Sequence, residues 1–331
     1  MPSPESLAWL AKLEQKYAAD QQDVNLYLEG AYHRRYVSYW DYVRLDTLLS
    51  LQAPLTNLPD EPIFIMYHQI TELYFKLCLH EYEQIGFTDG IGAEKLLMRV
   101  RRVNRYFRHL TESFAVMREG MERAQFLQFR TTLAPASGFQ SAQYRKIELA
   151  STPLGTLVGR ERRADLGDAP THAALMERLY WRAGAKVEST GAKALTLTRF
   201  EERYDAELTA WAARWQGHTL WEVYQRLPEA DRTAPELLKE MKALDKQINW
   251  LWPNVHVKTA ARYLADPEAA PHPGAAIGPD PEQATTAPPQ PPTSPTGTGG
   301  TNWAKYLPPV HQRRIFFPAL WTEQEVAAWG G

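Results

Sequence analysis

The stretch PIFIMYHQITELYFKLCLHEYEQI, residues 62–85, decides the fold class, because apolar side chains recur along it on one broad helical face. Pro62 stands near its start, where a helix tolerates proline. Gly86 and the DGIG cluster that follows end the pattern. The spacing therefore predicts a long helix over 62–85.

Helical spacing also recurs through most of the remaining chain. The expected helices cover residues 3–17, 39–52, 92–118, 171–187, 198–226 and a stretch beginning at 233. The last one starts with TAPE at 233–236, a capping-box pattern, and its apolar residues run from Leu237 to Val255 in steps of three and four. Only LTLT at 195–198 alternates weakly, as a strand does. The sequence predicts a single all-α domain over 1–331 with an N-terminal helical arm at 1–35.

Composition limits the class of protein. The 331 residues carry 37 basic and 39 acidic side chains, a net charge of −2, which argues against a nucleic-acid binder. The single cysteine, Cys78, excludes an intramolecular disulfide and fits a reducing compartment. No apolar run has the length of a membrane span or the form of a signal peptide, so we expect a cytoplasmic protein without a membrane partner.

Residues 266–296 interrupt the helical pattern. Ten of these 31 residues are proline, mixed with alanine, threonine and glycine. Such a stretch has too little apolar content to build a core. We expect a proline-rich disordered insertion. Taken alone, the GTGG at 297–300 indicates only the end of this insertion.

Two histidines lie within apolar helical stretches. His68 shares a helical face with Phe64 and Phe75, so it is either a core histidine or a polar group that faces a pocket. His256 follows Pro253, which should kink or restart the helix, and an imidazole at such a point can ligate a metal. A core role remains the alternative for both residues.

Arginines suggest two further features. Arg130 follows Phe126 and Phe129, so its guanidinium could hold a carboxylate while the rings surround an apolar body, as in an aromatic amino acid. A structural salt bridge is the alternative for Arg130. The basic helix around 99–108 is either a solvated face or a source of arginines for an anionic cofactor or a partner subunit.

Four motifs in a fixed order carry a resemblance to a known family. They are DEPIFIMYHQITELYFKLCLHE, FRTTLAPASGFQSAQYRKIE, WPNVHVKTAARYL and GTGG. Together with YWDYVRLDTLLSLQAPL before them and YLPPVHQRRIFFPALW after them, they resemble the tryptophan 2,3-dioxygenase family over about residues 36–322. The resemblance implies an all-α haem dioxygenase domain in a homotetramer.

The resemblance also implies roles for individual residues. His256, in the pattern Trp252, His256, Thr259, Arg262, would be the proximal ligand of the iron of haem b, and His68 would lie on the distal side. Substrate contacts would come from Phe64, Phe126, Arg130, Ser137 and Thr298, with Tyr39 and Tyr42 reaching into the site of a neighbouring subunit. The implied reaction adds both atoms of O2 across the indole C2–C3 bond of L-tryptophan and gives N-formylkynurenine, as in the kynurenine pathway.

The chain departs from the family's pattern at two places. GTGG is followed by Thr301, Asn302 and Trp303 where the family commonly has SSG, and Pro253 follows Trp252 where the family usually has arginine. These changes keep a second hypothesis open, a haem oxygenase or monooxygenase of the same superfamily that acts on a modified indole or another aromatic amino acid in secondary metabolism. A third hypothesis is a non-catalytic haem-binding or oxygen-sensing protein, which would need neither Arg130 nor Thr298.

Overall fold

The computed structural model describes residues 1–133, 140–159, 163, 166–167, 170–183, 193–264 and 314–328. The regular structure of these residues is helical, and an isolated β-bridge joins Val158 to Leu179. The predicted all-α fold is confirmed. None of the described helices is long and apolar enough to cross a membrane. The expected insertion at 266–296 lies outside the described residues.

Chain contacts divide the protein into two units, Met1–Ala53 and Pro54–Gly331. The first unit includes the expected arm of residues 1–35 and extends to Ala53. Its helices are α1 (Pro4–Ala19), α2 (Val24–His33), α3 (Tyr39–Val43) and α4 (Leu45–Leu48), and none of them contains a buried residue. The prediction of one helix over 39–52 is wrong, because Arg44 adopts a left-handed backbone conformation with φ of 55° and separates α3 from α4.

The second unit is a helical body. Its α-helices are α5 (Glu61–Gly86), α6 (Ala93–Glu119), α7 (Arg123–Phe129), α8 (Ala142–Ser151), α10 (His172–Glu177), α11 (Tyr180–Ala183), α12 (Leu195–Trp215), α13 (Leu220–Gln225), α14 (Glu229–Arg232), α15 (Pro235–Lys246), α16 (Trp252–Leu264) and α19 (Glu323–Ala328). Shorter elements are the 3₁₀ turns η1 (Arg130–Leu133), η3 (Leu154–Leu157) and η6 (Pro318–Leu320), and the π-helical turn η4 (Gln247–Leu251).

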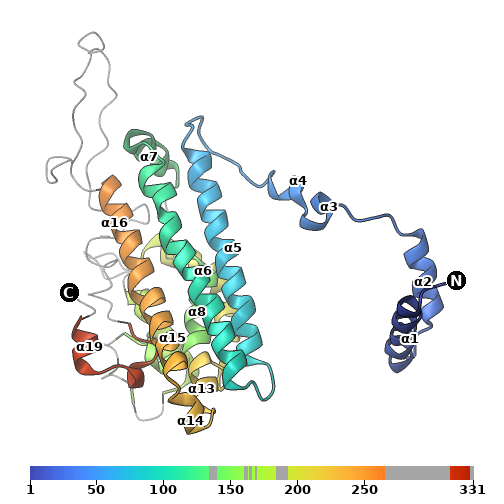
Figure 1. Ribbon diagram of the computed structural model, residues 1–331. Helices are drawn as coiled ribbons and strands as arrows, with labels where there is room; N and C mark the ends of the chain where they lie inside the picture. The colour runs from blue at the N-terminus through green and yellow to red at the C-terminus, as the bar shows by residue number, and fades with distance from the viewer. Residues whose placement is uncertain are drawn as a thin grey trace. The chain divides into compact units, whose positions relative to one another are not determined.

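Long helices enclose the core of this body. Helices α5 and α6 lie side by side, and α15 and α16 follow one another along α6 (Figure 1). The inward stripe of α6 is fully buried, as its spacing of three and four residues predicts. It consists of Leu96, Val100, Val103, Phe107 and Leu110. Burial of each such side chain contributes roughly 1.5–3 kcal/mol to the stability of the fold, so this stripe holds α6 between its neighbouring helices.

The π-helical turn η4 interrupts the long apolar stripe that runs from α15 into α16. Pro253 explains its position, because a proline has no amide hydrogen and its ring clashes with the carbonyl four residues earlier. That carbonyl belongs to Asn249, in the middle of η4. The chain stays helical from α15 through η4 into α16, so the disturbance predicted at Pro253 takes the form of a widened turn.

Two local predictions from the sequence are wrong. The TAPE stretch is not a capping box, since Pro235 opens α15 after Ala234, and the Thr233 hydroxyl donates back to the Glu229 carbonyl, 2.9 Å away. LTLT at 195–198 is the first turn of α12, where Leu197 packs into the core. Tertiary packing decides the structure of so short an alternating stretch.

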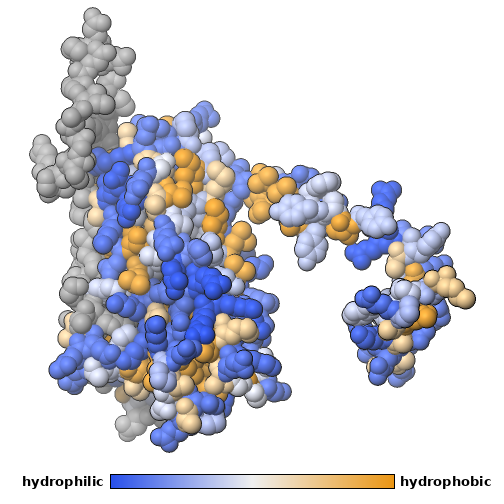
Figure 2. Space-filling view, in the orientation of Figure 1, coloured by the Kyte–Doolittle hydropathy of each residue, from blue (hydrophilic) through white to orange (hydrophobic). Residues whose placement is uncertain are grey.

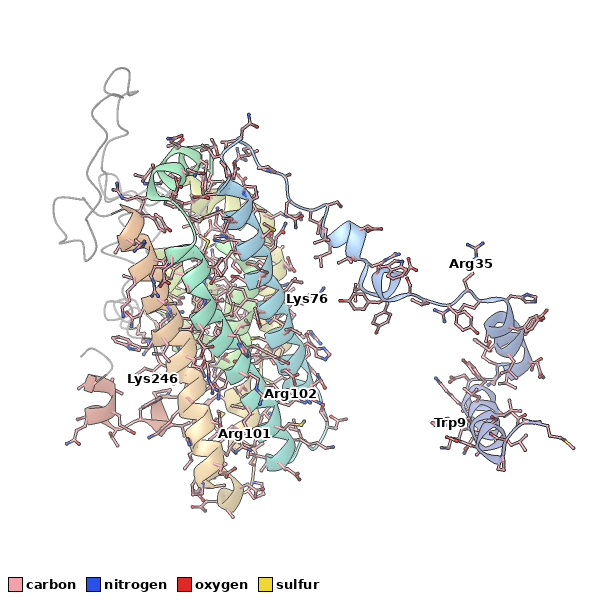
Figure 3. All side chains as sticks on the ribbon, turned by 45° about the horizontal axis from the view of Figure 1, so that its top comes forward. Trp9, Arg35, Lys76, Arg101, Arg102 and Lys246 are labelled. Carbon is pink, nitrogen blue, oxygen red and sulfur yellow. The ribbon has the colours of Figure 1, made fainter. Side chains whose placement is uncertain are left out.

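Basic residues of α6 form ion pairs between helices. Arg99 and Arg102 both contact Glu81 of α5, and Arg101 contacts Glu236 and Glu240 of α15. Figure 3 labels Arg101 and Arg102 of α6 and Lys246 of α15, and a hydrophilic band crosses the face of the body shown in Figure 2. The basic helix therefore serves partly to pair with neighbouring helices, a role that the sequence did not reveal.

Candidate active site

Helix α5 supplies His68 to the end of the body where α6, α7 and α16 meet. Its Nδ1 atom lies 2.7 Å from the carbonyl oxygen of Phe64, and the two rings are 4.1 Å apart between centroids. His68 is exposed by its accessible surface, yet nearby protein atoms lower its pKa by burial, with a smaller opposite effect from the Phe64 carbonyl. Both facts hold for a ring that lies between helices and is uncovered on one side.

An aromatic cluster surrounds this histidine. Phe64 packs near Phe126 at 6.1 Å and near Phe129 at 5.6 Å, and Phe126 packs against Tyr263 of α16 at 4.7 Å between ring centroids. Phe64 and Phe126 are partly buried, whereas Phe129 and Tyr263 are almost fully buried. The two partly buried rings thus form the face of the cluster that another planar group could meet.

His256 approaches the same region from α16. Its ring lies 6.0 Å from Phe114 in an edge-on arrangement and 6.0 Å from Trp252 in a stacked one. Burial and, to a smaller extent, the nearby His68 imidazole together lower its pKa to about 4. His256 is therefore neutral at pH 7, and a neutral imidazole nitrogen is the form that binds iron.

Arg130 lies at the end of α7, immediately after Phe129, and begins η1. It is half-buried, and burial lowers the pKa of its guanidinium, which stays charged. Helix α7 is held to the start of α5, because the Asp60 carboxylate accepts a hydrogen bond of 2.6 Å from the Glu122 amide. This bond fixes the entry of the helix that carries Phe126 and leads into Arg130.

The α16 helix is fixed by Tyr263. Its hydroxyl bonds to the carbonyl oxygens of Met117 and Met121, at the end of α6. Tyr263 stands seven residues after His256, on the same helical face, so a hydroxyl anchor holds the face that carries the imidazole.

The predicted site residues divide into three groups. Phe64, His68, Phe126 and His256 come together in the described structure, and Arg130 lies at the adjoining end of α7. Tyr39 and Tyr42 belong to the other unit, where their side chains are 72% and 82% exposed. Ser137 and Thr298 lie outside the described residues.

Sequence reasoning missed the second row of aromatic residues. Tyr67, Phe114 and Tyr263 join Phe129 in the buried part of the cluster. Helical spacing could have found one of them, because Tyr263 is at position i+7 from His256. Tyr67 and Phe114 carry no comparable signal, since they read as ordinary core residues of long helices.

Comparison with known proteins gives one family. The family model described as "Tryptophan 2,3-dioxygenase" matches residues 28–159. A protein of Bradyrhizobium sp. (strain BTAi1 / ATCC BAA-1182) named "Tryptophan 2,3-dioxygenase" is 30% identical over 294 residues, which cover 86% of this chain and 91% of that protein. One of Polaromonas naphthalenivorans (strain CJ2) with the same name is 29% identical over 87% of this chain and 90% of its own length.

A shorter match is more similar. A "Tryptophan 2,3-dioxygenase" of Ruegeria sp. (strain TM1040) is 43% identical over 114 residues, which cover 34% of this chain and 40% of that protein. The likeness therefore extends over most of the chain and is stronger in one part of it.

Proposed function

Since the chain belongs to the tryptophan 2,3-dioxygenase family, we propose that it adds both atoms of O2 across the indole C2–C3 bond of L-tryptophan. The product is N-formylkynurenine, and the prosthetic group is haem b. The observation that carries this proposal is the meeting of His68, His256 and the partly buried rings of Phe64 and Phe126 at one end of the helical body. Arg130 adjoins them as a group suited to a carboxylate.

The residues present fit a haem. His256 offers a neutral imidazole among aromatic rings, and the buried indole nitrogen of Trp252 has no hydrogen-bond partner within the described ranges. Among the described residues, no group of three or more histidine, cysteine, aspartate or glutamate side chains could hold a bare metal ion. A single imidazole suits an iron whose other ligands come from a macrocycle. When bound, haem supplies the oxygen-activating chemistry.

His68 would orient the substrate. A carbonyl oxygen only accepts hydrogen bonds, so the contact with Phe64 places the His68 proton on Nδ1 and leaves a lone pair on Nε2. Nε2 can accept the hydrogen bond of the indole N–H. Phe64 and Phe126 would flank the indole, whose flat apolar faces suit aromatic neighbours.

Arg130 would hold the other end of the amino acid. A guanidinium binds a carboxylate through two parallel hydrogen bonds, which fixes both distance and direction. Thr298 would bond to the ammonium and carboxylate groups, and Ser137 would lie near the indole and the haem propionates. Tyr39 and Tyr42 would come from a neighbouring subunit of a homotetramer, which agrees with their exposure in this chain. Fixing the substrate at both ends lowers the entropic cost of the reaction.

One assay tests the proposal. Purified protein is loaded with haem, reduced without oxygen, and mixed with O2 and L-tryptophan, and the product is identified by mass. We expect N-formylkynurenine from the wild type and none from His256→Ala, which should also lose most bound haem. The proposal is overturned if haem-loaded wild type leaves L-tryptophan unchanged. Turnover of a substituted indole in that case would favour the related oxygenase of secondary metabolism.

A further inference from the structure

A buried carboxylate outside the aromatic cluster receives hydrogen bonds from two separate parts of the chain. Asp245, in the last turn of α15, has 0% exposed surface. Its Oδ1 accepts from Asn249 Nδ2 at 2.7 Å and from the Phe316 amide at 2.9 Å. Its Oδ2 accepts from the Phe317 amide at 3.1 Å and from Trp321 Nε1 at 2.9 Å. No cation forms an ion pair with Asp245 in the described part of the chain. Burial of an anion whose partners are all neutral hydrogen-bond donors costs folding free energy, so the position of Asp245 needs a physical explanation.

The first part held by Asp245 is the π-helical turn η4. Asn249 lies in the middle of this turn, and its two preceding residues are also tied. Gln247 Nε2 donates to Asn104 Oδ1 at 3.1 Å, and the Tyr144 hydroxyl donates to the Ile248 carbonyl at 2.9 Å. Three consecutive residues of η4 are therefore fixed by side-chain hydrogen bonds.

Whether η4 is a π-helical or an α-helical turn determines the direction of the His256 side chain. Each residue added to a helix rotates everything after it by about 100°. A π-helical turn holds one extra residue relative to an α-helical turn, so its loss would turn α16 through about that angle relative to α15. His256 lies five residues after the end of η4. The same imidazole would then leave the face that meets Phe114.

The second part held by Asp245 is the C-terminal segment. Phe316 and Phe317 have 0% exposed surface, and Phe317 stacks on Trp221 at 5.6 Å between ring centroids. The Thr152 hydroxyl also donates to the Phe316 carbonyl at 2.8 Å. This segment is buried in the body, and it donates hydrogen bonds to both oxygens of the carboxylate.

We infer that Asp245 is a positioning residue for His256: its carboxylate joins η4 to the C-terminal segment and thereby holds α16 in the rotation that presents the imidazole to the aromatic cluster. The inference rests on the proposed function only in taking His256 as the iron ligand. Asp245 lies outside the aromatic cluster and acts on His256 through Asn249.

Three variants separate the two sides of Asp245. Asp245→Asn weakens the hydrogen bonds to η4 and to the C-terminal segment. An amide offers one acceptor oxygen, and its NH2 group turns a donor toward the remaining partners, which are donors themselves. Asn249→Ala removes only the bond to η4, and Trp321→Phe removes only one bond to the C-terminal segment. Glu325→Gln is the matched control, since Glu325 pairs with Lys242 between α19 and α15 on a partly exposed surface.

The test uses two kinds of readout besides activity, one on the haem-free chain and one on the loaded protein. The first is amide hydrogen exchange of residues 247–256 in the haem-free full chain, and the second is the iron–histidine stretching frequency and the haem dissociation rate of the loaded protein. We expect Asn249→Ala and Asp245→Asn to speed exchange in this segment, to shift the frequency, and to speed haem loss about three- to tenfold. Trp321→Phe should have a smaller effect, and Glu325→Gln none.

Each outcome decides the inference. Wild-type exchange and wild-type frequency in a folded Asn249→Ala protein would overturn it, even if Asp245→Asn fails to fold. Retention of haem by His256→Ala would also overturn it, because its premise would be gone. A wild type that binds haem through His256 but leaves L-tryptophan unchanged would refute the proposed function alone, and the exchange and frequency data would still decide the role of Asp245.

Discussion

His68 and Phe64 are joined by a contact of 2.7 Å between Nδ1 of the imidazole and the backbone carbonyl oxygen one turn earlier in α5. The contact fixes the tautomer, because the carbonyl can only accept. Burial lowers the pKa of His68, so the ring is neutral at pH 7 and its Nε2 is an acceptor. The partner expected for this acceptor is the indole N–H.

The first prediction tests that hydrogen bond. His68→Ala should lower kcat/KM for L-tryptophan about tenfold, which corresponds to about 1.4 kcal/mol for one hydrogen bond. N1-methyl-L-tryptophan cannot donate this bond, so for it the variant and the wild type should have similar kcat/KM. Steady-state kinetics with both substrates provide the measurement. An equal loss with both would show that His68 does not act through the indole nitrogen.

The second prediction concerns Arg130. Arg130→Ala should raise the KM for L-tryptophan strongly, since loss of a desolvated charge pair costs roughly 2–5 kcal/mol. Tryptamine has no carboxylate, so its weaker turnover should respond little to the same change. Arg118→Ala is the control, because Arg118 forms an exposed pair with Glu119 at the end of α6. Similar KM changes for both substrates would assign Arg130 a structural role.

Much of this fold and part of this site could be predicted from the sequence, for a physical reason. Long helices such as α5 and α6 repeat their apolar residues over many turns, so the signal accumulates along the helix. The helical neighbours Phe64 and His68 are also a local matter, since positions i and i+4 lie on one face. Their contact was therefore predictable without any knowledge of the tertiary structure.

Features that depend on distant residues could not be predicted. The capping-box prediction for TAPE at 233–236 failed in this way. Pro235 begins α15 one residue later than a capping Thr233 would require. Asp245 reads as a surface residue of an amphipathic helix, and only the return of Phe316 and Trp321 makes it a buried acceptor. Its spacing to Asn249 suggests one hydrogen bond at most.

The third prediction uses the pKa of Asp245. Burial raises it from the ordinary value of 3.8 to about 6, partly offset by the hydrogen bonds from Phe316, Trp321, Phe317 and Asn249. The folded state therefore binds this proton more tightly than the unfolded state does. Its stabilising contribution is complete below about pH 4, is lost as the pH rises to about 6, and is constant above that. The change is on the order of 3 kcal/mol.

Urea unfolding of the haem-free protein between pH 4 and pH 7 checks this sign. The free energy of unfolding of Asp245→Asn, minus that of the wild type, should rise by that amount over the interval. His68 and His256 act in the opposite direction, because their lowered pKa values favour the folded state as the pH rises, but they are present in both proteins and cancel in the difference. A difference that does not vary with pH would contradict the raised pKa.

The fourth prediction concerns Gly86, where α5 ends against α12. A Cβ atom at this position would lie 2.6 Å from Cζ3 of Trp215 and 2.8 Å from the backbone carbonyl oxygen of His218. The Trp215 ring is fully buried and the carbonyl belongs to the main chain, so neither can move cheaply.

Overpacking of this kind costs about 1–3 kcal/mol, more than the about 1 kcal/mol that alanine gains over glycine inside a helix. We therefore expect Gly86→Ala to lower the midpoint of thermal unfolding by several degrees, at about 2–4 °C per kcal/mol. Gly155→Ala is the control, because among the described residues only its own chain neighbours come within 4 Å of a Cβ there, and its midpoint should stay near that of the wild type. A Gly86→Ala midpoint at or above that of the wild type would mean that α5 and α12 can separate without loss.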